Sequence, residues 1–124
     1  NSAMSPGEAC NSCHDSMGGP PTIIGGTVYA TAHEASNCTS TSTTGETVVI
    51  TDAAGHVFKL PVHSVGNFYC TGSRCAGFTP PYNAYVVNAN NVYRAMGAKQ
   101  TSGDCNSCHT QTGAMGAPGR IIAP

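Results

Sequence analysis

The chain is poor in aromatic and charged residues. It contains no Trp, only three Phe and five Tyr, and charged residues make up 9% of its 124 positions. The net charge is −1 and the Lys and Arg residues form no basic patch, which excludes the electrostatic footprint of a nucleic-acid-binding protein. There is no acidic tail, and no apolar run reaches the length of a membrane span. The length fits one domain, which can bury only a modest core unaided.

One pentapeptide, CNSCH, occurs near both ends of the chain, at residues 10–14 and 105–109. The composition predicts roughly 0.02 chance matches to C-x-x-C-H, so two copies are not coincidence. This spacing is typical of a c-type haem attachment site, in which two cysteines form thioethers and the histidine binds iron. The two copies predict two covalently bound haem c groups. The thioether cysteines are expected to be Cys10, Cys13, Cys105 and Cys108, and the proximal iron ligands His14 and His109.

Two other kinds of site use paired cysteines. A redox-active dithiol of the thioredoxin type needs a βαβ context, and neither copy of the motif has one. A zinc site formed by both C-x-x-C pairs stays open as an alternative, but it leaves the histidine after each pair unexplained. Haem attachment accounts for all three defining residues of each motif and is therefore the preferred interpretation.

Three cysteines lie outside the motifs. Cys70 and Cys75, in CTGSRC, are followed by Ala76 and so lack a proximal histidine. In an oxidising compartment, the simplest interpretation is a small disulfide loop between them. Cys38 is then unpaired within the subunit, or pairs between subunits, or takes Cys70 or Cys75 as its partner instead.

The two ends resemble each other beyond the pentapeptide. Residues 17–24 (MGGPPTII) and 115–122 (MGAPGRII) match at five of eight positions without a gap. A glycine and an acidic residue also precede each motif, so the ends read as two copies of one haem-binding segment. We expect one folded unit with an N-terminal haem segment, a β-sandwich spacer and a C-terminal haem segment. These parts cover residues 1–24, 25–92 and 93–124.

The middle of the chain has short segments rich in Val, Ile, Thr, Tyr and Phe, separated by Gly, Pro, Asn or Asp. TDAAGH is a turn signal between two of them and predicts a hairpin. Helix is signalled only weakly, at residues 91–99 and as a single turn at each motif. The fold class is therefore mainly β, a small sandwich with little helix. Strands are expected within residues 25–31, 46–52, 56–62, 66–71 and 82–88.

Each iron also needs a sixth ligand, whose identity sets the redox potential: Met raises it, and a second His generally lowers it. Met17 cannot reach the far face of its own haem, because three residues span at most about 11 Å. Ligation by two His at both haems is preferred, and it leaves no open iron position for catalysis. The distal candidates are His33 and His63, with His56, Met96 and Met4 as alternates.

The segments MSPGEACNSCH, GGTVY, AHEASNC, VVITDAAG, GNFY, YRAM and SGDCNSCHTQTGAMGAPGRI together resemble small secreted di-haem proteins of metal-reducing and related bacteria. The resemblance implies an Ig-like or transthyretin-like β domain between two haem motifs, and extracellular or periplasmic electron transfer. Such proteins are similar in kind to the multihaem cytochromes that polymerise into conductive filaments, called cytochrome nanowires. This chain has only two motifs, so a long wire requires polymerisation.

The sequence therefore predicts an electron carrier rather than an enzyme. It is expected outside the cytoplasm after signal-peptide removal, because the chain begins at Asn1 and haem c is attached there. Its partners are expected to be other redox proteins or copies of itself, joined head to tail, without nucleic acid or a small organic substrate. A monomeric periplasmic shuttle and an open-iron haem enzyme or sensor are the alternatives.

Overall fold

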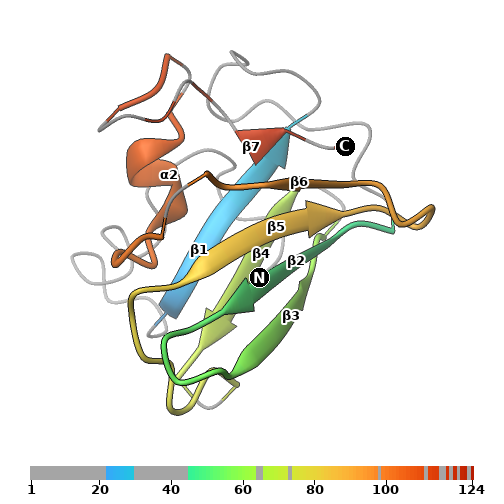
Figure 1. Cartoon of the computed structure of the whole chain (residues 1–124). Helices are drawn as coiled ribbons and strands as arrows, with labels where there is room; N and C mark the ends of the chain where they lie inside the picture. The colour runs from blue at the N-terminus through green and yellow to red at the C-terminus, as the bar shows by residue number, and fades with distance from the viewer. Residues whose placement is uncertain are drawn as a thin grey trace.

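The described part of the chain is mainly β and forms two sheets, with one helical turn (Figure 1). This confirms the predicted fold class, a small β-sandwich with little helix. The computed structural model describes residues 22–29, 45–63, 66–72, 74–97, 99–110, 112–114, 117, 119, 121–122 and 124.

The first sheet has three strands in the order β4-β1-β7. Its central strand, β1 (Thr22–Tyr29), pairs antiparallel with β4 (Asn67–Thr71) and parallel with β7 (Ile121–Ile122). The Ile-Ile pair that ends the C-terminal repeat forms β7, whereas the corresponding pair of the N-terminal repeat lies near the start of β1. Both repeat ends therefore belong to the same sheet.

The second sheet has four antiparallel strands in the order β3-β2-β5-β6. β2 (Thr47–Thr51) and β3 (Val57–Pro61) form the hairpin that TDAAGH predicts. β5 (Asn83–Val87) pairs with the other edge of β2, and β6 (Tyr93–Ala95) is the outer strand next to β5. Five strands were predicted from the sequence, and β1 to β5 correspond to them.

The weakly signalled helix at residues 91–99 was wrong, because β6 occupies that region. The cause is a tight turn just before it. The Asn88 side chain accepts hydrogen bonds from the backbone N–H groups of Asn90 and Val92, and Asn91 has a φ of 62°. Asn is well suited to both roles. The turn reverses the chain and brings β6 back against β5.

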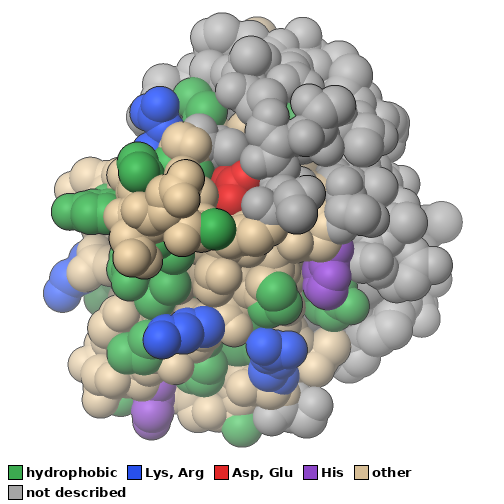
Figure 2. Space-filling model, turned by 90° about the vertical axis from the view of Figure 1, so that its right-hand side faces the viewer, with side chains coloured by type: hydrophobic (Ala, Val, Ile, Leu, Met, Phe, Trp, Pro, Cys, Tyr) green, Lys and Arg blue, Asp and Glu red, His purple; other side chains and the backbone are tan. Residues whose placement is uncertain are grey.

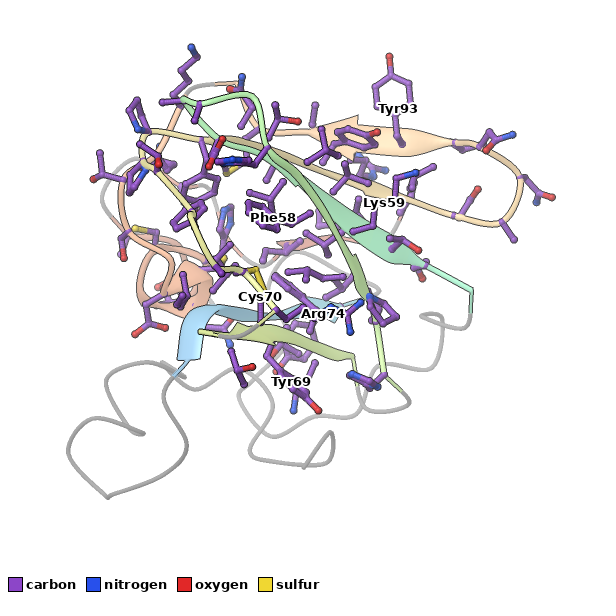
Figure 3. All side chains as sticks on the ribbon, turned by 90° about the horizontal axis from the view of Figure 1, so that it is seen from below. Phe58, Lys59, Tyr69, Cys70, Arg74 and Tyr93 are labelled. Carbon is purple, nitrogen blue, oxygen red and sulfur yellow. A yellow bond between two sulfur atoms is a disulfide. The ribbon has the colours of Figure 1, made fainter. Side chains whose placement is uncertain are left out.

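The core lies between the two sheets. Side chains alternate across a strand, so every second residue faces the opposite sheet. Figure 3 shows Phe58 between the layers, whereas Tyr69 and Tyr93 point away from opposite sides. The buried core contains Ile24, Val28, Phe68 and Cys70 from the first sheet, Val48, Ile50, Leu60 and Val86 from the second, and Cys75 and Tyr82 from the segment between β4 and β5.

Cys70 and Cys75 form a disulfide, as the sequence analysis expected (Figure 3). Both residues are fully buried, and the backbone N–H of Cys75 donates to the Thr71 carbonyl at 3.0 Å. The bridge therefore ties the segment after β4 to the core. Cys38 lies outside the described residues.

Candidate haem site

The second CNSCH motif forms α2 (Cys105–Cys108), a single helical turn. The backbone N–H of His109 donates to the Cys105 carbonyl at 2.9 Å and closes the turn. Residues three apart in a helix lie on the same face, so both cysteines point toward the same side of α2. This is the helical turn that was expected at the second motif.

Two glycines allow the motif to approach β1 closely. The backbone N–H of Gly25 donates to the Gly103 carbonyl at 2.9 Å, and a side chain at Gly103 would collide with the Ile23 carbonyl. A Cβ at Gly26 would lie 2.8 Å from the Cβ of Cys105, and also within contact distance of Phe68. Only glycine fits at such positions. Gly103, which precedes the second motif, is thus needed for the close packing of that motif against β1.

Asn106, inside the motif, anchors it to β1. This side chain is 2% exposed. Its Oδ1 accepts a hydrogen bond from the Thr27 backbone N–H at 3.0 Å, and its Nδ2 donates to Thr27 Oγ1 at 3.0 Å. Thr27 Oγ1 in turn donates to Asn67 Oδ1 at 2.8 Å. The sequence analysis missed this role; the available signal was that Asn occupies the same position in both copies of the motif.

The orientation of the His109 ring is fixed by a backbone carbonyl. The Nδ1 atom of His109 lies 2.9 Å from the carbonyl oxygen of Gly119. Gly119 is a buried residue. A carbonyl only accepts, so Nδ1 carries the hydrogen and the lone pair of the neutral ring is on Nε2. Metal-binding histidines commonly have this arrangement, because the second nitrogen is held by an outer hydrogen bond.

Cys105, Cys108 and His109 all line one cavity of about 610 Å³. This volume is within the range of about 300–1,000 Å³ typical of cofactor and ligand sites. The other walls are mostly apolar and come from both sheets. They include Val48, Ile50, Phe68, Val86, Ile121 and Ile122. Two cysteines on one side of a helical turn, one oriented imidazole and an apolar lining fit a covalently attached haem.

Strand β6 contributes Arg94 to the cavity, and Met96 follows immediately after the strand. Met96 is half-buried and packs against the core, and its backbone N–H donates to the Ala84 carbonyl at 3.0 Å. Arg94 pairs with the buried Val86. Opposite residues of paired strands share a face, so Arg94 is on the face of the sheet that borders the cavity.

Tyr82 is a buried polar residue of the same cavity. Its hydroxyl donates to the Ser102 carbonyl at 2.5 Å. Burial raises the pKa of Tyr82 above its usual range, and the nearby Cys105 and Cys108 groups raise it further. The hydroxyl therefore stays protonated and holds the segment that leads into α2.

Neither described histidine among the distal candidates lines the cavity. The His63 ring stacks on Tyr69, with ring centroids 5.2 Å apart. His56 lies at the tip of the β2–β3 hairpin and is 51% exposed, with its Nδ1 2.9 Å from Asp52 Oδ2. Met96 is the distal candidate that the structure does place in the cavity. The remaining predicted site residues, Cys10, Cys13, His14, His33 and Met4, lie outside the described residues.

Asp52 explains the position of His56. Burial of this carboxylate raises its pKa, but hydrogen bonds from the His56 ring and from the backbone N–H groups of Thr79 and His56 outweigh that effect and lower the pKa to about 2. The carboxylate thus joins the hairpin tip to the segment that follows the disulfide. In this arrangement His56 is part of a turn-stabilising network.

Among the described residues, acidic and basic side chains differ in burial. Glu46, Asp52 and Asp104 are buried, whereas Lys59, Arg74, Arg94 and Lys99 are exposed. Figure 2 shows the blue side chains dispersed among tan and green rather than gathered into one patch.

The described residues hold no group of three or more His, Cys, Asp or Glu side chains arranged to bind a metal ion. A zinc site made by both C-x-x-C pairs would need Cys10 and Cys13, which lie outside them. Across the same residues, no helix is long and apolar enough to span a lipid bilayer.

Comparisons with known proteins add no relatives. No protein-family model matches the chain, and neither a curated protein nor a solved structure matches it.

Proposed function

We propose that the protein is a di-haem c-type cytochrome that transfers electrons in the periplasm or outside the cell. The observation that carries this proposal is that Cys105, Cys108 and His109 line a single apolar cavity. When bound, haem c supplies reversible one-electron exchange between Fe(III) and Fe(II). The Cys70–Cys75 disulfide supports the location, because structural disulfides are rare in reducing compartments.

The chain supplies attachment, orientation and exclusion of water at the C-terminal haem. Cys105 and Cys108 would form the thioethers, and His109 would bind iron through Nε2. The apolar walls would limit the contact of water with the ring, which is one means of tuning its potential. Met96 is our assignment for the sixth ligand, since it is the described distal candidate in the cavity.

The second haem is assigned to the N-terminal motif from the sequence. Cys10, Cys13 and His14 repeat the pattern of the C-terminal site, including the asparagine and serine between the cysteines. Two haems in one small chain give electrons an entry and an exit. The prediction of ligation by two His continues to apply to this haem, with either His33 or His63 as its one sixth ligand.

Head-to-tail polymerisation is the further step of this proposal. A haem segment at each end would let the C-terminal segment of one copy contact the N-terminal segment of the next. Such a contact is heterologous and can propagate as a filament. Electron microscopy of the concentrated holoprotein tests this: filaments are expected, whereas monomers alone would support a soluble shuttle.

Covalent haem counting tests the proposal itself. The chain is expressed with a signal peptide in a host that matures c-type cytochromes, and intact mass should show two haems that resist acid–acetone extraction. The double variant C105S/C108S should retain one haem. The matched control C70S/C75S, which changes the disulfide cysteines, should retain two. A wild-type chain without covalent haem would overturn the proposal.

The alternative of an open-iron enzyme or sensor predicts a five-coordinate haem that binds CO. Met96 in the cavity favours a closed iron instead. A six-coordinate, low-spin spectrum without reaction with CO is therefore expected at the C-terminal haem. High-spin haem that binds CO in the wild-type protein would favour the alternative.

A further inference from the structure

We propose that Arg94 binds the propionate carboxylates of the C-terminal haem and so fixes the orientation of the haem in its cavity. This inference depends on the proposed function. It assigns a role to a residue that neither the C-x-x-C-H motif nor the choice of axial ligands involves.

The two edges of a haem c ring carry different groups, and these groups need different partners in the protein. Thioether bonds from Cys105 and Cys108 to the two former vinyl groups would hold that edge of the ring at α2. The two propionates belong to other positions on the ring, and each carries a negative charge near neutral pH. Burial of unpaired carboxylates is costly, so these groups need either water or a cation. A cationic side chain in the cavity lining would meet this need.

Arg94 meets this requirement. Among the described residues that line the cavity, it is the one with a cationic side chain; the other charged residue is Asp104. Lys59, Arg74 and Lys99 are exposed and are not part of the lining. A guanidinium can bind carboxylates with two parallel hydrogen bonds, which fixes direction as well as supplying charge.

The strand geometry sets the position of the Arg94 side chain. Arg94 pairs with the buried Val86, whereas its neighbours Tyr93 and Ala95 pair with Val87 and Tyr85. Consecutive residues of a strand face opposite sides. Tyr93 and Tyr85 meet on the outer side, with ring centroids 5.7 Å apart. Arg94 thus shares the sheet face of Val86, and it is exposed on β6, the edge strand of the sheet.

The guanidinium of Arg94 has no hydrogen-bond or ion-pair partner in the described part of the chain. Arg74 differs, because its guanidinium donates to the Lys59 carbonyl at 3.2 Å. Figure 3 labels these two residues, of which Lys59 belongs to β3. Arg74 is therefore a matched control: an exposed arginine of the same domain that does not line the cavity.

Potentiometry and resonance Raman spectroscopy of the holoprotein test the inference. In Arg94→Gln, we expect one of the two haems to have a lower midpoint potential, because loss of a nearby positive charge favours Fe(III). Its propionate bending mode should also shift. Arg94→Lys should keep the potential closer to wild type but still shift the propionate mode, since it retains the charge without the bidentate geometry. Arg74→Gln should change neither property.

The outcomes separate the two proposals. An Arg94→Gln protein that carries two covalent haems, with potentials and propionate modes equal to those of Arg74→Gln, would overturn the role of Arg94 alone. A wild-type chain without covalent haem would overturn the proposed function and this inference together. A lower potential at one haem together with a shifted propionate mode supports both.

Discussion

Asn106 and Thr27, 79 residues apart in the sequence, are joined by two hydrogen bonds of 3.0 Å each. The two residues are buried, at 2% and 0% exposure. Thr27 is in the central strand of the first sheet, and Asn106 lies between the two cysteines of the motif. The side-chain amide therefore holds the turn of the second CNSCH motif against the sandwich and accepts a hydrogen bond from a buried backbone N–H.

Replacement of Asn106 by Ala should destabilise the protein by about 1–3 kcal/mol, because the backbone N–H of Thr27 would be left buried without this acceptor. Urea denaturation followed by circular dichroism measures the change. Asn83→Ala is the control, since Asn83 is an exposed strand residue and should alter stability by no more than about 0.5 kcal/mol. Equal midpoints for the two variants would contradict the anchoring role.

Acid should weaken the fold through Asp52. Its folded pKa is about 2, below the ordinary value of 3.8, so its contribution is present above pH about 4 and is lost as pH falls toward 2. Asp52→Asn should lower stability at neutral pH and flatten the pH dependence between 4 and 2. Thermal melts at several pH values test this.

His56→Gln provides the comparison for Asp52. It removes the ring partner but leaves the backbone N–H groups of Thr79 and His56 as donors to the carboxylate. We expect it to retain part of the acid sensitivity. If Asp52→Asn and the wild type lost stability in parallel below pH 4, another carboxylate would have to be responsible.

Glu46 should affect the pH dependence of stability in the opposite direction to Asp52. It is 4% exposed, and burial raises its pKa above the ordinary value of 4.5. A carboxyl group with a raised folded pKa favours the folded state when it is protonated, so its contribution falls as pH rises above about 4.5. Glu46→Gln should therefore be more stable than wild type at pH 7, with a smaller difference at pH 4. Lower stability of this variant at pH 7 would show that the charge has a stabilising partner.

The strands that were predicted correctly are those whose formation depends on the local pattern of residues. Val48, Ile50 and Val86 belong to short β-branched runs, and the turn TDAAGH sits between two such runs, so β2, β3 and β5 were predictable. The disulfide was predictable for a similar reason, because Cys70 and Cys75 are close in sequence and lack a following histidine. Local signals sufficed for these features.

The features that were missed depend on specific side-chain contacts, one of them local and another between distant segments. β6 is a strand because the side chain of Asn88 stabilises a turn that returns the chain to β5, and residues 91–99 alone gave a weak helical signal. The role of Asn106 requires Thr27, and the cavity requires that β6 and α2 border the same space. The Asn88 turn spans only a few residues but depends on a particular side chain, whereas Asn106 and Thr27 are 79 residues apart, so no short window of sequence contains both.

The identity of the sixth ligand gives the most direct test of the C-terminal site. Met96 lines the same cavity as His109, whereas the His56 ring is bound to Asp52 and the His63 ring stacks on Tyr69, and neither lines that cavity. Met96→Leu preserves the volume but removes the sulfur. One of the two haems should then bind CO, which a visible spectrum of the reduced protein records.

Met96→His completes the test, because it restores a ligand of a different kind. The same haem should return to a six-coordinate, low-spin state, and its potential should be lower than in wild type, since a second His generally lowers the potential that Met raises. The other haem, which has its own sixth ligand, should be unchanged in both variants and serves as an internal reference. If Met96→Leu left both haems closed to CO, the ligand would have to come from a segment such as the one that carries His33 or Met4.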